Sequence, residues 1–149
     1  MVRVVAQRVR SASVTVDETV VAAIERGLAL LVGIEEADEG PEVDRVADKV
    51  AVIRLFDDEA GKMNLSTSEI GGSMLVVSQF TLYGDVRKGR RPSYIRAARP
   101  EKGNLLYQRF IERLRSHGYP VCVGIFGANM LVAIENDGPV TIILDSTEV

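Results

Sequence analysis

The stretch MLVVSQFTLYGD, residues 74–85, decides the fold class, because its first four residues predict a strand that is buried on both faces. Met74 to Val77 are all apolar and lack the polar alternation of a half-exposed strand. Ser78, Gln79 and Thr81 then follow with little break in the extended pattern. A core strand that ends in uncharged hydrogen-bonding side chains either leaves the core for solvent or carries a site.

Patterns on both sides of this stretch predict further strands and two helices. Residues 27–34 are continuously apolar, as in a central strand, and residues 2–4 and 13–16 alternate, with a turn at 17–19. Residues 121–126, 130–135 and 140–144 are also predicted strands. A helix starts at Gly40-Pro41-Glu42, and a second spans residues 100–117 with Gly118 as its cap. We expect a strand-rich mixed α/β or α+β fold.

The bulk composition indicates one globular domain over residues 1–149. Apolar residues make up 46% and charged residues 26% of the chain, which is typical of soluble proteins. No apolar run approaches the roughly 20 residues of a membrane-spanning helix, and the N-terminus lacks a signal-peptide pattern. One cysteine predicts a reducing, cytoplasmic setting. The net charge of −3 gives no global argument for nucleic acid.

Residues that usually catalyse reactions are scarce. His117, the single histidine, falls at a predicted helix end, where it complements the helix dipole. Cys122 lies in an apolar strand pattern typical of a small buried thiol. Asp57-Asp58-Glu59 reads as a solvated acidic loop. No zinc spacing, P-loop or dinucleotide fingerprint is present, so we expect neither a metal nor a cofactor.

Two features stand out from this background. The first is a basic run in a predicted loop, which is either a solvated surface or a polyanion-binding patch. It comprises Arg87, Lys88, Arg90, Arg91, Arg96, Arg99 and Lys102. The second is Asn136-Asp137-Gly138-Pro139-Val140-Thr141, where Asp-Gly predicts a hairpin turn. Proline after that glycine is unusual for an ordinary hairpin, so this segment is either a simple turn or a rigid piece of backbone with a functional role.

These motifs together resemble D-aminoacyl-tRNA deacylase of the bacterial and eukaryotic type. The resemblance rests on Ser78-Gln79-Phe80-Thr81-Leu82 and on residues 136–141, in the family's order and at its separation. Gln7-Arg8-Val9, Gly61 to Leu65, Arg91-Pro92-Ser93 and Phe126 to Met130 fit as well. The match runs from the first strand almost to the last residue. Tyr83-Gly84 departs from the family pattern, in which small residues are common.

The resemblance implies a homodimer with a barrel-like core of twisted β-sheets and two main flanking helices. It implies hydrolysis of the ester between a D-amino acid, or glycine, and the 3′-terminal adenosine of tRNA. The partner is then aminoacyl-tRNA, and neither DNA nor a membrane. Gly138-Pro139 is implied to be a cis peptide that enters the active site of the other subunit, held by Arg8. Phe126 and Met130 are implied to line the adenosine pocket.

For catalysis, the resemblance places the reaction at Ser78, Gln79, Phe80 and Thr81. Backbone N–H groups freed at the strand end would stabilise the oxyanion, and the substrate's ribose 2′-hydroxyl would activate water. Thr81 is expected to be a pocket residue, because a threonine nucleophile needs an adjacent base. Arg87, Lys88, Arg90 and Arg91 are the expected tRNA contacts. The alternatives are a non-catalytic RNA-binding module and a hydrolase of unrelated small esters.

Overall fold

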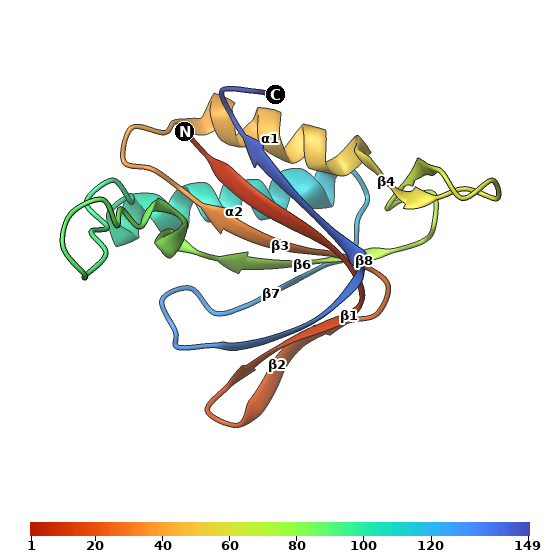
Figure 1. The fold of residues 1–149 in the computed structure, drawn as a ribbon, viewed down its shortest axis with the longest axis horizontal. Helices are drawn as coiled ribbons and strands as arrows, with labels where there is room; N and C mark the ends of the chain where they lie inside the picture. The colour runs from red at the N-terminus through yellow and green to blue at the C-terminus, as the bar shows by residue number, and fades with distance from the viewer.

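The computed structural model describes all residues from Met1 to Val149 and shows a curved sheet covered by two helices (Figure 1). The helices are α1 (Gly40–Val52) and α2 (Pro100–Ser116), and both were expected. The large sheet contains β1 (Arg3–Val16), β2 (Thr19–Ile24), β3 (Gly27–Gly33), β6 (Ser73–Ser78), β7 (Val121–Val123) and β8 (Leu131–Asp145). A small sheet, missed by the sequence patterns, pairs β4 (Arg54–Asp57) with β5 (Met63–Ser66).

The two longest strands, β1 and β8, run antiparallel along their whole length, from the Arg3–Asp145 pair to the Thr15–Leu131 pair. Each had been expected as two shorter strands. The expected hairpin turn at Asp137-Gly138 is therefore wrong, because the residues before and after it pair with the same strand. The ladder absorbs the interruption as register shifts between Gln7 and Ser11 of β1, a position that tolerates a proline.

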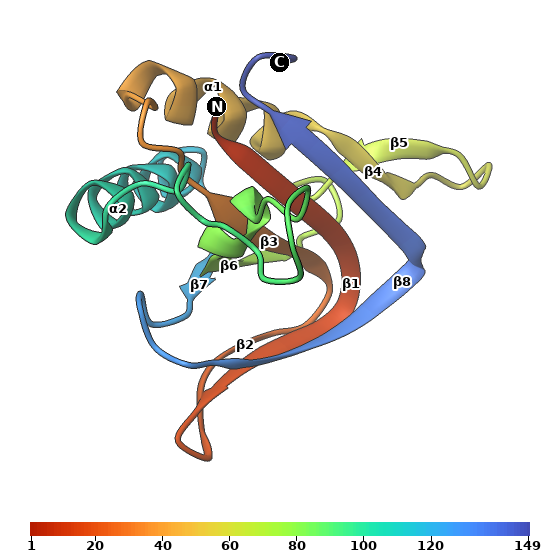
Figure 2. The same cartoon turned by 60° about the vertical axis from the view of Figure 1, so that its left-hand side comes forward.

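The sheet bends because β2 and β3 share the other edge of β1. The first half of β1 pairs with β3, while its second half pairs with β2. The half that carries β2 folds over the parallel strands β3, β6 and β7 (Figure 2). The sheet is thus nearly closed, and the expectation of a strand-rich, barrel-like fold with two flanking helices is confirmed.

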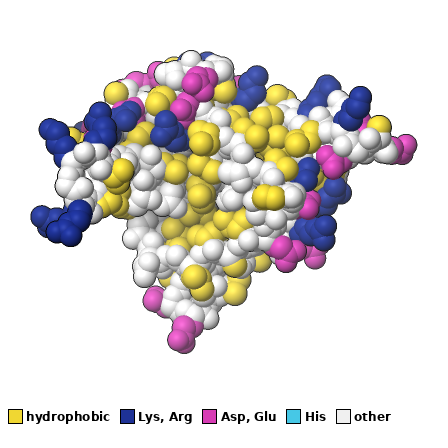
Figure 3. Space-filling view, viewed as in Figure 1, with side chains coloured by type: hydrophobic (Ala, Val, Ile, Leu, Met, Phe, Trp, Pro, Cys, Tyr) yellow, Lys and Arg dark blue, Asp and Glu magenta, His cyan; other side chains and the backbone are white.

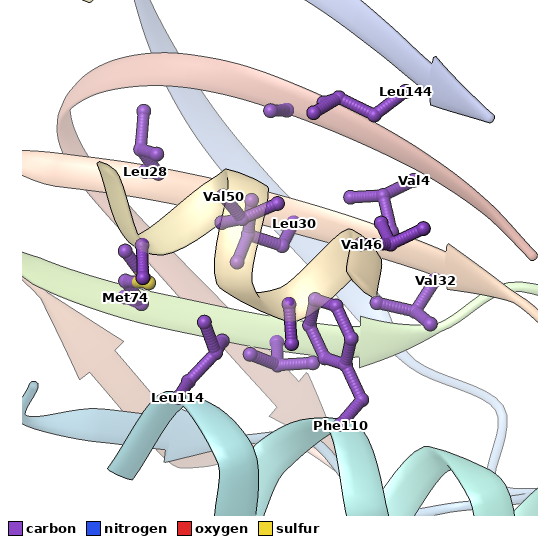
Figure 4. Close-up of a cluster of buried hydrophobic side chains, with 14 of the residues drawn as sticks. Val4, Leu28, Leu30, Val32, Val46, Val50, Met74, Phe110, Leu114 and Leu144 are labelled. Atoms are coloured by element: carbon purple, nitrogen blue, oxygen red, sulfur yellow. The ribbon is translucent and has the colours of Figure 1, made fainter. Parts of the chain in front are cut away.

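Strand β6 is buried on both faces, as its apolar sequence predicts. Met74 and Val76 pack into the larger core between the sheet and the helices (Figure 4). Leu75 and Val77 face a smaller core beneath the folded half of the sheet. Each such side chain contributes roughly 1.5–3 kcal/mol by burial. A one-residue slip would exchange the two faces, so this double burial fixes where Ser78 lies.

Beyond Ser78 the chain leaves the extended conformation. Residues Phe80–Tyr83 form a short 3₁₀ helix, η1, so the expectation that the extended pattern continues through Thr81 is wrong. The Tyr83 hydroxyl donates to the Gly33 carbonyl oxygen over 3.0 Å, and this contact turns the chain back onto β3. On the other side of β6, the expected strand 121–126 ends at Val123. Both strands therefore stop at the same edge of the sheet.

Ion pairs join the two helices. Arg109 pairs with Asp44, and Arg113 and His117 both pair with Asp48. The Arg113 guanidinium and then the His117 ring hold the pKa of Asp48 well below its usual range. His117 is thus a bridge between α1 and α2, at the end of α2 where its sequence position placed it. Neither helix is long and apolar enough to cross a membrane.

Candidate active site

A cavity of about 550 Å³ opens where β6 and β7 end. The strand end contributes Ser78, Gln79 and Phe80, and the residues after β7 contribute Phe126 and Met130. Nine of its fourteen lining residues are hydrophobic, so it suits a ligand with substantial apolar surface. The lining also includes Val77, Tyr94, Ala97, Ala98, Pro100, Gly127, Ala128, Asn129 and Val132. Tyr94, Ala97, Ala98 and Pro100 were not singled out from the sequence as pocket residues.

The early end of β7 leaves a backbone donor unpaired beside this cavity. The last hydrogen bond between the two strands runs from the Gly124 N–H to the Val76 carbonyl oxygen, at 3.1 Å. The next rung would join the Ser78 N–H to Gly124, and it is not formed. Phe80 begins η1, so its N–H has no acceptor inside that helix. Ser78 and Phe80, which both line the cavity, therefore carry backbone N–H groups without an acceptor in the protein.

The Gln79 N–H is different, because it donates to the Val32 carbonyl oxygen over 2.8 Å on the β3 side. The expectation of free N–H groups throughout residues 78–80 is therefore wrong at Gln79. The Gln79 side chain donates from Nε2 to Thr81 Oγ1. An amide donor cannot take a proton from a hydroxyl, so this contact orients Thr81 without activating it.

Buried aromatic contacts hold the opposite wall. The Tyr107 hydroxyl donates to the Val76 carbonyl oxygen over 3.0 Å, and burial raises the pKa of Tyr107 to about 12. The Tyr107 ring packs against Phe126 with 5.8 Å between the ring centroids. Phe126 is thereby held at the cavity by a residue of the larger core.

The basic run divides into paired and unpaired cations. Arg96 pairs with Glu35, Arg99 pairs with Glu36, and Lys102 pairs with Glu39. These contacts tie residues 96–102 to the chain after β3 and leave those three cations paired with carboxylates. Arg87 pairs with Asp85 in the same loop and lowers the pKa of that carboxyl to about 2.

Three cations in this loop, Lys88, Arg90 and Arg91, make no ion pair in the structure. Hydrogen bonds between Asp85 and Ser93 close the loop that carries them. Lys and Arg side chains gather over this loop at the left of the molecule (Figure 3). The free positive charge of the run therefore projects from one closed loop near the cavity.

The second motif is rigid but lies away from the cavity. Arg8, only 8% exposed, donates from Nε to the Asp137 carbonyl oxygen and from Nη1 to the Leu55 carbonyl oxygen. Asn136 Nδ2 donates to the carbonyl oxygens of Arg8 and Val140. The Gly138–Pro139 peptide bond is cis. Neither residue lines the cavity, which β8 reaches only near Val132.

The remaining candidates from the sequence lie outside the cavity. Cys122 is half-buried in β7 and packs against the smaller core. Asp57 is the last residue of β4 and forms an ion pair with Arg8, at 3.5 Å. No group of three or more potential metal ligands occurs in the structure.

These features define an α/β protein with a mostly apolar cavity at the carboxyl ends of two parallel strands. A family model described as D-Tyr-tRNA(Tyr) deacylase matches residues 5–145. A curated D-aminoacyl-tRNA deacylase of Thermomicrobium roseum is 58% identical over 98% of this chain and 95% of its own length. The chain belongs to the D-aminoacyl-tRNA deacylase family, and it is an enzyme that acts as a deacylase.

Solved structures show the same fold. A protein described as c-Myc DNA Unwinding Element Binding Protein superposes with a TM-score of 0.89 at 41% identity, covering 96% of this chain and 97% of that one. A probable eukaryotic D-amino acid tRNA deacylase superposes with a TM-score of 0.85 at 18% identity, covering 97% of this chain and 98% of that one.

Proposed function

We propose that this enzyme hydrolyses the ester between a D-amino acid, or glycine, and the 3′-terminal adenosine of tRNA, acting in the cytoplasm as a homodimer. The observation that carries the proposal is the separation of its two motifs. Gly138 lies six residues along β8 from Val132, the last cavity residue on that strand, a span of about 20 Å. A second copy of the chain can bring Gly138-Pro139 to the cavity, and this protomer alone does not.

Phe126 and Met130 then receive the adenosine, since they line the apolar wall opposite the strand end. The aminoacyl ester lies at residues 78–81. During attack by water the ester oxygen becomes an oxyanion, which preorganised N–H donors stabilise. The unpaired Ser78 N–H and the first N–H of η1, at Phe80, are the donors that we assign to this role. The Gln79 and Thr81 side chains orient the strand end and the substrate.

Water activation falls to the substrate, because the cavity lining contains no histidine, carboxylate, lysine or cysteine. Thr81 Oγ1 accepts a hydrogen bond from an amide, so it has no base that could make it a nucleophile. The ribose 2′-hydroxyl lies next to the scissile ester by the chemistry of the substrate. We assign it the role of directing the attacking water.

Selection against L-amino acids follows from exclusion by Gly138-Pro139 of the other protomer. Arg8 and Asn136 fix this peptide, and its glycine lets the backbone approach the substrate's amino group closely. A D side chain points away from the peptide, whereas an L side chain would collide with it. Exclusion requires no contact with the D side chain, so many D-residues and glycine are accepted.

The test is to incubate the purified protein with matched D- and L-tyrosyl-tRNA and to follow the release of free tyrosine. We expect release from the D-ester and almost none from the L-ester. Equal rates on both esters would reject chiral selection. Binding of tRNA without release would instead support the RNA-binding module, and hydrolysis of small esters without salt dependence would support the unrelated hydrolase.

A second expected result concerns the loop that carries the unpaired cations. Replacing Lys88, Arg90 and Arg91 together with alanine should raise KM for all D-aminoacyl-tRNAs alike and lower its salt dependence. Each lost phosphate contact reduces the slope of log K against log salt by about one unit. Arg87→Ala should have a smaller effect, because Arg87 already pairs with Asp85. The measurement is KM across a series of salt concentrations.

Arg115 provides the matched control, since it is a half-exposed arginine on α2 paired with Glu112. Arg115→Ala changes the net charge without removing a cation from the loop. An unchanged salt slope in the triple variant, or an equal change in Arg115→Ala, would show that the loop is only a solvated surface.

A further inference from the structure

Two aromatic side chains at the mouth of the cavity remain partly in solvent. Phe80 is 56% exposed and Tyr94 is 39% exposed. Their rings meet edge to face, with 5.2 Å between the centroids and 76° between the planes. The other three tyrosines of the chain are buried, and their hydroxyls donate hydrogen bonds. The Tyr94 hydroxyl makes none, so the fold itself gives no reason for an exposed tyrosine here.

Tyr94 lies at the junction between the cavity and the basic loop. It directly follows Ser93, whose hydrogen bonds with Asp85 close the loop of Lys88, Arg90 and Arg91. Its ring packs on Gly84, where an added β-carbon would lie only 3.1 Å from the ring. Gly84 therefore supports one side of the Tyr94 ring by close packing. Its position places an aromatic surface between the apolar cavity and three unpaired cations.

We infer that Phe80 and Tyr94 form a stacking platform for the base of the nucleotide that precedes the terminal adenosine. This inference rests on the proposed function. The aminoacyl-adenosine occupies the cavity, so the preceding nucleotide leaves through the mouth. Proteins bind unpaired nucleotides by stacking bases on aromatic rings and pairing cations with phosphates. The platform supplies the first contact, and the loop supplies the second.

Stacking also suits the substrate class. Every base has a face that can stack, so an aromatic platform accepts a single strand without reading its sequence. An enzyme that acts on many aminoacyl-tRNAs needs this kind of contact with their common single-stranded end. The platform therefore binds the single-stranded acceptor end, while the cavity recognises the amino acid and the adenosine.

The experiment compares D-tyrosyl-adenosine with the D-tyrosyl ester of the trinucleotide CCA. For the wild-type protein, kcat/KM should be larger for the trinucleotide. In Tyr94→Ala the ratio of the two kcat/KM values should fall about tenfold, mostly through KM. Tyr94→Phe keeps the ring and should keep the ratio. Tyr94→Leu keeps apolar volume without a π-face, so the ratio of the two kcat/KM values should fall in this variant as well. It provides the test if the alanine variant proves unstable.

Two results would overturn the platform: a wild-type enzyme with no preference for the trinucleotide, or an equal loss on both substrates in Tyr94→Leu. Failure of the proposed function is a separate result, in which the wild type releases tyrosine from neither ester. The affinities of the wild type and of Tyr94→Leu for uncharged CCA and for adenosine would then test the platform. A preference for CCA that disappears in Tyr94→Leu supports the platform, and equal binding by both proteins rejects it.

Discussion

D-Tyrosyl-tRNA that ends in 2′-deoxyadenosine should be hydrolysed about 100- to 10,000-fold more slowly than the normal substrate, the range of a lost general acid–base group. The cavity lining contains no histidine, carboxylate, lysine or cysteine side chain. His117 pairs with Asp48 between the two helices, and Cys122 lies in β7, outside the cavity lining. Loss of the 2′-hydroxyl therefore leaves the attacking water without a directing group. Single-turnover rates of ester loss measure the effect.

Thr81→Ala is the companion variant, and it should retain activity within about tenfold. Thr81 is exposed and lies outside the cavity lining, contrary to its expected place in the pocket, and its only side-chain hydrogen bond is with the Gln79 amide. His117→Ala and Cys122→Ser should change the rate little. Rapid hydrolysis of the deoxy substrate, or an aminoacyl adduct trapped on Thr81, would contradict catalysis by backbone donors and substrate.

Gly138→Ala should lower kcat/KM for D-aminoacyl-tRNA about 100-fold, the usual loss for a displacement near 1 Å at a reacting centre. Gly138 has a φ of +118°, which an alanine rarely adopts. An added β-carbon would lie 2.9 Å from Val140 Cγ2 and 3.0 Å from Arg8 Nη2. Arg8 is buried and holds the Asp137 and Leu55 carbonyl oxygens through Nε and Nη1, so a shift of its guanidinium would disturb the segment that it holds.

Gly118→Ala is the matched control. Gly118 also has a positive φ, +90°, but an added β-carbon there meets nothing within 4 Å. This variant should lose stability by roughly 1–2 kcal/mol, the cost of a left-handed conformation for a residue with a β-carbon, and keep its catalytic constants. Assays of both variants with D- and L-tyrosyl-tRNA, alongside thermal unfolding, separate backbone strain from damage to the site. Wild-type rates and chiral preference in Gly138→Ala would remove the reason for placing this peptide in the active site.

Local pattern was enough to predict the elements whose environment is uniform along their length. The apolar run Met74 to Val77 predicted burial on both faces, and the two cores on either side confirm it. Helix α1, with Pro41 in its first turn, and helix α2, which ends just before Gly118, carry their own start and stop signals. The two signature motifs identified the family, because they depend on residue identity and order.

Tertiary pairing decided the rest. The Asp137-Gly138 turn signal is real locally, but both flanking strands pair with β1, so the chain continues as a single strand. The basic run contains seven cations in the sequence, yet four of them are paired with carboxylates. The free donor at Ser78 depends on where β7 stops, more than forty residues later. Pattern and propensity act between near neighbours, whereas strand pairing, ion pairs and the cavity depend on residues that only the folded chain brings together.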